Sequence, residues 1–320
     1  MSNYEFDPDF ASILPLLPTE SDLSNAAEIP EMRKQRDAMM ASLRPPDRDD
    51  VLKRDLRVAG GGEGLEIALR IYTPRAEATA PRPLFYEIHG GGFLFGDIEM
   101  MDPWCQALAA HAGVVVASVD YRLAPEHPFP AGVEDCYAGL VWCHDHAAEL
   151  GIDSSRMAVG GQSAGGGLAA AVALLCRDRG GPELCFQLLE IPELDDRLDT
   201  PSMRAFTDTP MWNRPNAVWS WRHYLGPDAS GEVSPYAAPA RAIDLAGLPA
   251  AYVSTMEFDP LRDEGILYAL RLMQAGVSVE LHSYAGTFHG SALQAEAGVS
   301  KRNAAEVFEV VRRRLAERRP

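Results

Sequence analysis

Gly161-Gln162-Ser163-Ala164-Gly165 is the stretch that decides the fold of this chain. An apolar run over 157–159 precedes it and predicts a short buried strand, and an alanine-rich run over 168–175 predicts a helix. A serine on a strand-to-helix turn, with glycine two residues before and after, is typical of a nucleophile elbow. Side chains at Gly161 and Gly165 would collide with the neighbouring strand and helix. The alternative is a glycine-rich turn with an incidental serine, so the rest of the chain has to decide.

Composition favours a globular α/β protein. The 320 residues suffice for one large domain with a smaller attachment. A net charge of -17 argues against a nucleic-acid partner, which usually meets a basic surface. No apolar run is long enough to insert into a membrane, and residues 1–10 lack the features of a signal peptide, so we expect a cytoplasmic protein. The five cysteines show no metal-binding spacing and are expected to be small buried residues.

Two helical segments interrupt a regular alternation of strands and helices. We expect an N-terminal helical cap segment over 1–50, a cap insertion over 193–225, and an α/β core in two parts, 51–192 and 226–320. Strands are predicted over 51–58, 65–72, 84–88, 114–119, 157–159, 184–191, 250–256 and 278–284. Helices are predicted over 30–43, 103–111, 132–150, 168–175, 263–274 and 303–317. Continuous apolar strands alternating with helices indicate a mostly parallel sheet covered on both faces.

A nucleophilic serine needs a base, and the candidate is His289. Of the eight histidines, it is the only one that follows the last predicted strand, in the loop 286–290. There it is free to point at the edge of the sheet where the serine lies. His144 and His146 are two residues apart on a predicted helix, so they diverge and do not share a metal. A loop histidine is more often a plain surface residue, but its position and order favour His289.

The orienting acid should follow another strand, between the serine and the histidine in the chain. Asp259 satisfies this, because it follows the strand 250–256 and precedes a proline that keeps it extended. Glu257, Asp263 and Glu264 compete for the role. The last two fall at a helix start, where an acidic residue often stabilises the helix dipole instead.

An oxyanion hole needs backbone N–H groups. One should come from Ala164, directly after the nucleophile, and the others from a glycine-rich loop after an early strand. The stretch 89–92, His-Gly-Gly-Gly, is such a loop. A plain flexible turn is the alternative, and the elbow downstream argues against it.

At this point the chain resembles the hormone-sensitive-lipase family of α/β-hydrolase esterases. The resemblance covers about residue 50 to the end, and the N-terminal helical piece fits that family's cap. It rests on His89-Gly90-Gly91-Gly92, Tyr121-Arg122-Leu123-Ala124-Pro125-Glu126, Gly161-Gln162-Ser163-Ala164-Gly165-Gly166, Asp259-Pro260-Leu261-Arg262-Asp263-Glu264 and His289-Gly290. It implies Ser163 as nucleophile, Asp259 as acid and His289 as base. It also implies that Gly91, Gly92 and Ala164 donate to the oxyanion, and that His89 and Gly90 shape the loop.

One departure from the family pattern precedes the nucleophile. Gln162 stands where the family usually has Asp or Thr, and the neutral amide removes a charge next to the serine. The pair 290–291 stands where an aromatic residue often follows the histidine, so that wall of the pocket is expected to be more open. Neither change touches the three proposed catalytic residues.

The sequence therefore predicts a serine carboxylic-ester hydrolase that acts through an acyl-enzyme and needs no metal or organic cofactor. Its partner would be a small-molecule ester, and a homodimer is left open. The two cap segments should close an apolar cavity, so rates should fall once an acyl chain fills it. The resemblance implies short- to medium-chain esters. The alternatives are an acyltransferase, which product analysis with added alcohol would reveal, and a catalytically idle binding protein, which would normally lack a triad member.

Overall fold

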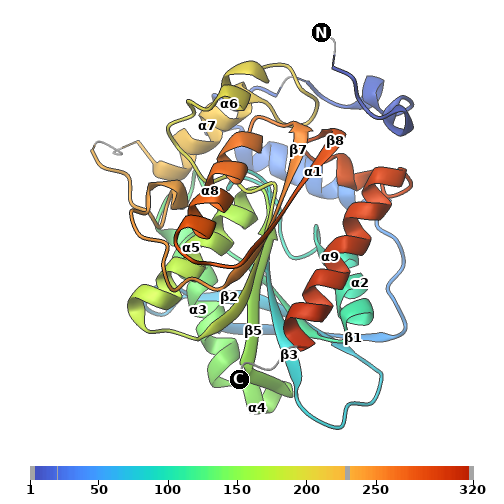
Figure 1. The fold of residues 1–320 in the computed structure, drawn as a ribbon, viewed down its shortest axis with the longest axis vertical. Helices are drawn as coiled ribbons and strands as arrows, with labels where there is room; N and C mark the ends of the chain where they lie inside the picture. Colours follow the sequence, from blue (N-terminus) through green and yellow to red (C-terminus); the bar gives the residue numbers. More distant parts are fainter. Residues whose placement is uncertain (1–3, 20, 228–230, 317–320) are drawn as a thin grey trace.

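A mostly parallel β-sheet runs through the centre of the molecule (Figure 1). The computed structural model describes residues 4–19, 21–227 and 231–316. Within these residues the strands are β1 (Val51–Ala59), β2 (Glu66–Pro74), β3 (Arg82–Ile88), β4 (Val115–Asp120), β5 (Ile152–Gln162), β6 (Leu184–Glu190), β7 (Ala250–Phe258) and β8 (Val279–Phe288). They form one sheet in the order β1-β2-β4-β3-β5-β6-β7-β8.

The sheet opens with an antiparallel hairpin formed by the first two predicted strands. β1 pairs antiparallel with β2, and β2 pairs antiparallel with β4. All the following pairs, from β4–β3 to β7–β8, are parallel. The fold class predicted from the alternation of strands and helices is therefore confirmed. The carboxyl ends of the parallel strands meet along one edge of the sheet, where α/β proteins place their ligands.

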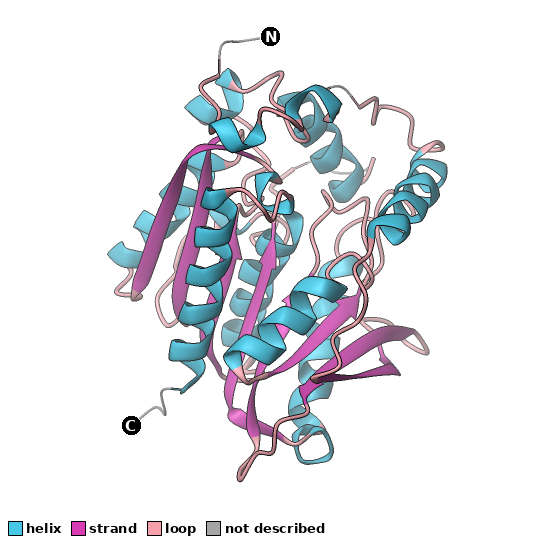
Figure 2. Cartoon of the chain, turned by 90° about the vertical axis from the view of Figure 1, so that its right-hand side faces the viewer, coloured by secondary structure: helices cyan, strands magenta, loops and turns pink. Residues whose placement is uncertain are grey.

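Helices cover both faces of the sheet (Figures 1 and 2). The main α-helices are α1 (Ile29–Leu43), α2 (Asp102–Ala112), α3 (Ala131–Asp145), α4 (Ala147–Leu150), α5 (Ala164–Arg179), α6 (Pro201–Ala205), α7 (Arg214–Leu225), α8 (Arg262–Gln274) and α9 (Gly298–Ala316). Short 3₁₀ helices are η1 (Pro8–Phe10), η2 (Leu14–Leu16), η3 (Pro239–Arg241) and η4 (Ser291–Leu293). α2 and α9 pack on one face of the sheet, and α3, α5 and α8 pack on the other.

The apolar strands are buried because both faces of the sheet are covered. In β4, Val115, Ala117 and Val119 pack into the core under α3 and α5, whereas Val116 packs under α2 and α9. All four are at most 1% exposed. Successive side chains of a strand point to opposite faces, so a strand buried on both sides must be apolar throughout.

Several bounds differ from the prediction. β8 continues to Phe288, through the residues expected to form a loop, so His289 follows the strand directly. The pairing of β8 with β7 shifts register before Phe258, and Gly286 has a φ of 72°. A bulge of this kind lets a strand continue across residues that suggest a turn. The helix expected over 132–150 is divided into α3 and α4, and α9 begins five residues earlier than expected.

The N-terminal segment and the 193–225 segment contact each other beyond the carboxyl ends of the strands. The Met211 N–H donates to the Pro18 carbonyl at 2.8 Å, and the Asn213 amide donates to the Thr19 carbonyl at the same distance. Tyr4 Oη donates to Asp208 at 2.6 Å. These bonds join parts of the chain about 200 residues apart, and Figure 2 shows the helical pieces gathered at that end of the sheet.

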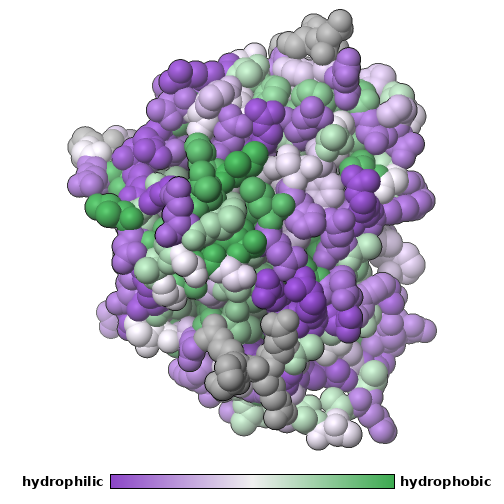
Figure 3. Space-filling model, in the orientation of Figure 1, coloured by the Kyte–Doolittle hydropathy of each residue, from purple (hydrophilic) through white to green (hydrophobic). Residues whose placement is uncertain are grey.

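An apolar surface patch covers the outer side of α8 (Figure 3). Leu267, Leu270 and Met273 are each more than 40% exposed there. α8 packs beside β8, which is an edge strand.

Among the described helices, none is both long and apolar enough to cross a membrane. Cys105, Cys136, Cys143 and Cys176 are buried, and Cys185 is half-buried.

Candidate active site

Ser163 lies on the turn between β5 and α5, at the carboxyl end of a central strand. Its φ of 58° and ψ of −123° are a strained conformation for a residue that carries a side chain. A Cβ added to Gly161 or Gly165 would lie 2.3 or 2.0 Å from the Ile88 carbonyl oxygen. The turn therefore packs directly against the end of β3, and only glycine fits at these two positions.

Three backbone hydrogen bonds hold the strained serine. The Ser163 N–H donates to the Glu190 carbonyl at 2.9 Å. The Ser163 carbonyl accepts from the N–H groups of Gly167 and Glu193, each at 3.0 Å. The residue also caps α5, so the free N–H groups of the first helical turn lie beside its hydroxyl.

His289 bridges Ser163 and Asp259. Its Nε2 lies 3.0 Å from Ser163 Oγ, and its Nδ1 lies 2.8 Å from Asp259 Oδ2. The Asp259 carboxylate accepts a hydrogen bond from the Nδ1–H group, which leaves Nε2 as the acceptor for the serine hydroxyl. The second Asp259 oxygen accepts the Leu261 N–H at 2.9 Å. Asp259 is fully buried and the other two side chains are nearly so, which strengthens this chain of bonds.

The three competing acids are bonded to the backbone elsewhere. Glu257 accepts the Gly286 N–H at 2.7 Å. Asp263 accepts the Ser202 N–H at 2.7 Å, and Glu264 accepts the Leu194 N–H at 2.6 Å. The contact with His289 is made by Asp259. The geometry therefore distinguishes Asp259 from the three acids that competed with it in the sequence.

His89 begins the glycine-rich loop, and its side chain is held by contacts with Gly90 and Tyr121. Its Nδ1 lies 2.8 Å from the Gly90 carbonyl, and its ring stacks on Tyr121 with centroids 4.2 Å apart. Tyr121 Oη donates to the His89 carbonyl at 2.9 Å. Burial lowers the pKa of His89 to about 4, so its imidazole is neutral and Nδ1 donates to Gly90. His89 therefore fixes the start of the loop.

The glycine-rich loop approaches its neighbours too closely for side chains. A Cβ on Gly91 would lie 2.1 Å from the Phe95 carbonyl oxygen, and one on Gly92 would lie 2.4 Å from the Trp212 ring. Both glycines have positive φ, 118° and 59°. In the part of the chain that the structure describes, no loop or turn hydrogen bond uses the N–H of Gly91, Gly92 or Ala164 as donor. These N–H groups are candidates for binding an oxyanion.

Trp212 is a site residue that no sequence motif singled out. It lies against Gly92, and its ring centroid is 5.9 Å from that of His289. The neighbouring Met211 lies within 3.6 Å of a Cβ built on Gly290. The only signal in the sequence was the cluster of tryptophan and methionine in the 193–225 segment, which does not say which of them reaches the serine.

Gln162, the departure before the nucleophile, contacts a buried acid. Its Nε2 donates to Glu190 Oε2 at 3.2 Å. Burial raises the pKa of the Glu190 carboxyl to about 7. Glu190 lies inside the strand predicted over 184–191. The apolar pattern of that strand gave no sign that Glu190 lies near the site.

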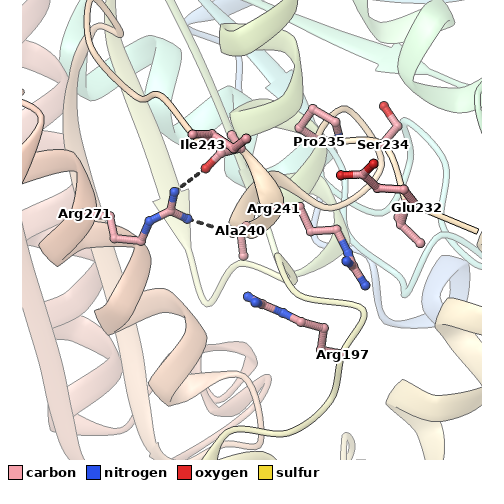
Figure 4. A pocket seen from close by; sticks show the side chains of 10 residues that line it. Arg197, Glu232, Ser234, Pro235, Ala240, Arg241, Ile243 and Arg271 are labelled. Carbon is pink, nitrogen blue, oxygen red and sulfur yellow. Dashed lines mark hydrogen bonds between the residues drawn. The ribbon is translucent and has the colours of Figure 1, made fainter.

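A pocket of about 840 Å³ lies away from Ser163, beside η3 and α8 (Figure 4). Three arginines line it, but each already has partners. Arg197 and Arg241 form ion pairs with Asp195 and Asp196, and Arg271 donates to the carbonyls of residues 240 and 242. We therefore place the candidate active site at Ser163.

Among the described residues, no group of three or more His, Cys, Asp or Glu side chains is arranged to hold a metal ion.

Comparisons with known proteins identify the fold family of the chain. A family model described as the α/β hydrolase fold matches residues 85–293. Carboxylesterase NlhH of Mycobacterium tuberculosis is 40% identical over 291 residues, covering 89% of this chain and 88% of that protein. Esterase LipI of the same organism is 38% identical over 288 residues, covering 89% and 87%. The solved structure of a bacterial heroin esterase is 55% identical, with a TM-score of 0.92, and the match covers 97% of this chain and 98% of that one.

Proposed function

We propose that Ser163 is the nucleophile of this chain, His289 its general base and Asp259 the acid that orients the histidine. The chain belongs to the hormone-sensitive-lipase family of α/β-hydrolases and is a carboxylesterase. One observation carries the proposal: the imidazole of His289 lies within hydrogen-bond distance of both Ser163 Oγ and the Asp259 carboxylate. A serine hydroxyl is a weak nucleophile until a base accepts its proton.

The reaction proceeds in two halves. Ser163 Oγ attacks the ester carbonyl carbon while its proton passes to His289 Nε2. The N–H groups of Gly91, Gly92 and Ala164 stabilise the tetrahedral oxyanion, and His289 then returns the proton to the departing alcohol. A water molecule, deprotonated by the same imidazole, attacks the acyl-serine. The carboxylic acid leaves and Ser163 regains its proton.

The substrates in this proposal are esters with short to medium acyl chains. Trp212 and Met211 stand over the glycine-rich loop and Gly290, and the N-terminal segment is bonded to the same stretch through Pro18. A cavity roofed in this way gains roughly 0.8 kcal/mol for each buried methylene until it is full. Beyond that point, overpacking costs about 1–3 kcal/mol, so longer chains react more slowly.

The deciding test is Ser163→Ala, assayed with a 4-nitrophenyl ester. Hydrolysis should fall to the uncatalysed background while the circular dichroism spectrum stays unchanged. The matched control is Ser291→Ala, since Ser291 is also buried but its hydroxyl contacts Met256 Sδ at 3.9 Å. Mass spectrometry after a pulse of substrate should find the acyl group on the Ser163 peptide. More than a trace of turnover in Ser163→Ala would show that the nucleophile lies elsewhere.

A cytoplasmic location and the absence of a nucleic-acid partner remain predictions from the sequence, which left a homodimer open. The exposed apolar side chains of α8, beside the edge strand β8, support a homodimer because apolar patches of this kind often mark interfaces. Sedimentation of the unchanged chain and of Leu270→Glu tests it. A dimer that the substitution dissociates is expected, and a monomer in both samples would contradict it.

A further inference from the structure

The acid and the base of the proposed mechanism both follow the last paired residues of the sheet. Phe258 of β7 pairs with Phe288 of β8. The next residue on the first strand is Asp259, and the next on the second is His289. The register shifts between Met256 and Phe258, so this last pair is set apart from the regular ladder of β7 and β8. Its position therefore depends on what else packs against it.

The bulge in β8 directs the backbone of Gly286 away from the ladder. Gly286 has no partner residue on β7 in the register of the two strands. Its N–H donates to the Glu257 side chain at 2.7 Å, and its carbonyl accepts the N–H of Asp7 at 2.8 Å. A Cβ added to Gly286 would lie 2.9 Å from the Asp7 nitrogen. The N-terminal segment is thus in direct contact with the bulge that precedes His289.

Phe6 contacts both rings of the last pair. Its ring centroid lies 5.2 Å from that of Phe258 and 5.3 Å from that of Phe288, with interplanar angles of 86° and 74°. Phe10 makes a further contact with Phe288, at 5.2 Å and 71°, and is fully buried. Edge-to-face arrangements of this kind are favourable and specific in their geometry. Phe6 therefore links the two strand ends through their side chains.

The N-terminal segment is also fixed to other elements. Asp9 accepts the Gly298 N–H, at the start of α9, with a distance of 2.8 Å. The ring centroid of Tyr4 lies 5.4 Å from that of Phe258 and 5.9 Å from that of Phe206, which follows α6. The segment is therefore held by α9 and by the 193–225 segment as well as by the two strand ends.

We propose that residues 6–10 are a positioning element for the catalytic acid and base, because they hold the ends of β7 and β8 in the register in which Asp259 and His289 bond. The inference rests on the proposed function, since it takes these two residues as acid and base. The element acts through the last aromatic pair and the bulge. This role differs from covering the substrate cavity, because the contacts lie on the strands that carry the acid and the base.

Loss of this support should slow the chemistry more than it weakens substrate binding. The bond between Asp259 and His289 orients the imidazole for both proton transfers. A displacement of about 1 Å at a catalytic group can lower a rate by about 10²-fold. The glycine-rich loop and the Trp212 ring belong to other elements, so substrate contacts there should persist. We therefore expect kcat to fall while KM changes little.

Two variants remove the support in different ways. Phe6→Ala removes the ring that contacts both phenylalanines. Asp7→Pro removes the N–H that donates to Gly286, and Asp7 already has a φ of −56°, which proline adopts. Each should lower kcat by roughly tenfold to a hundredfold, which is less than the limit of about 10⁴-fold set by Asp259→Asn. Phe6→Leu refills most of the space with an apolar side chain and should recover most of the lost kcat.

Matched controls separate positioning from a general loss of stability. Asp7→Ala loses the same carboxylate as Asp7→Pro but keeps the N–H, so it should keep its kcat. Phe308→Ala removes another half-buried ring, which packs against Trp104 with centroids 6.2 Å apart on the face of the sheet that α2 and α9 cover. It should lower the melting temperature and leave kcat unchanged at temperatures where it stays folded.

The proton on His289 Nδ1 gives a second readout. A proton shared with a carboxylate is strongly deshielded, so its NMR resonance lies at low field, and Asp259→Asn identifies the resonance by removing it. Phe6→Ala and Asp7→Pro should shift this resonance to higher field or broaden it, because the hydrogen bond becomes longer and less uniform. Asp7→Ala and Phe308→Ala should leave it in place.

An unchanged kcat in folded Phe6→Ala, or an equal kcat in Asp7→Pro and Asp7→Ala, would overturn the proposal. An equal loss of kcat in Phe308→Ala would do the same, because the effect would then follow from stability alone. If Phe6→Ala fails to fold, the comparison of Asp7→Pro with Asp7→Ala decides. Turnover in Ser163→Ala or full activity in Asp259→Asn would instead refute the proposed function, so the two failures are distinguishable.

Discussion

Replacing Glu193 by Gln should stabilise the folded protein at alkaline pH and leave its stability near pH 5 almost unchanged. The unfolded chain exposes Glu193 to water, where its carboxyl ionises near its ordinary value of 4.5, but burial in the folded protein raises that pKa to about 8. The folded state therefore binds a proton that the unfolded state has released over this range. Glutamine has no proton to lose, so the variant avoids the effect.

The size of the effect follows from the two pKa values. For a group whose folded-state pKa is raised, the contribution to stability is complete below the unfolded value and is lost as the pH rises through the folded value. Each pH unit in between costs about 1.4 kcal/mol. The unchanged chain should thus lose roughly 2 kcal/mol relative to Glu193→Gln by pH 6, and about 4 kcal/mol by pH 8. A domain is stable by only about 5–15 kcal/mol, so the difference is measurable.

Urea denaturation of both chains at pH 5, 6, 7 and 8 measures this difference directly. Taking the difference between chains cancels other titrating groups, including His89, whose lowered pKa stabilises the fold in the opposite direction as the pH rises. Glu190→Gln is the comparison. Because the pKa of the Glu190 carboxyl is about 7, the stability that this variant gains over the unchanged chain should stop growing about one pH unit earlier. A difference between Glu193→Gln and the unchanged chain that is constant from pH 5 to 8 would refute the reasoning. It would mean that Glu193 is ionised in the folded protein.

Three further predictions concern the site and its cap. Asp259→Asn should lower kcat by up to about 10⁴-fold through the wrong histidine tautomer, whereas Glu257→Gln should cost far less; the reverse order would contradict the choice of acid. Gly92→Ala should lower kcat/KM by roughly 10²–10³-fold, because its Cβ would meet Trp212 at 2.4 Å; Gly180→Ala, with a similar positive φ but open surroundings, is the control and should keep its activity. Deleting residues 1–45 should lower the melting temperature and flatten the fall of kcat/KM along a series of 4-nitrophenyl esters of increasing chain length. Faster hydrolysis of long-chain emulsified triglycerides than of short esters by the intact chain would contradict a closed cavity.

The strands and the elbow were predictable because their physical constraints are local. A strand buried on both faces has to be apolar throughout, and the run in β4 shows this directly. Gly161 and Gly165 are required by contacts with the Ile88 carbonyl, so the motif itself records the close approach. The end of β8 was not predictable in the same way, because its bulge depends on pairing with β7.

The sequence predicted a cap over the site but not which of its side chains would meet the catalytic residues, because those contacts join distant parts of the chain. Trp212 reaches Gly92 and His289 only because the segment around it is bonded to residues near the N-terminus. A hydrophobic pattern marks such a segment as buried, but it carries no information about which partner each side chain meets. The sequence favoured Asp259 but left three competing acids, because all four lie close together around the end of β7. The geometry separates them, since Asp259 makes the contact with His289.

Glu190 and Glu193 show why a pattern of polar and apolar residues misses part of this site. Such a pattern treats every glutamate as charged, and therefore as a surface residue or the end of a strand. Both residues are buried beside Ser163, with raised carboxyl pKa values. A group kept neutral at this cost to stability needs a compensating use, and local rules are broken most often at functional sites. The Glu190 carbonyl accepts the Ser163 N–H, and the Glu193 N–H donates to the Ser163 carbonyl. The two glutamates thus hold both sides of the strained serine turn through their backbones, and burial of their carboxyl groups at the ends of these contacts lowers the stability of the fold at neutral and alkaline pH.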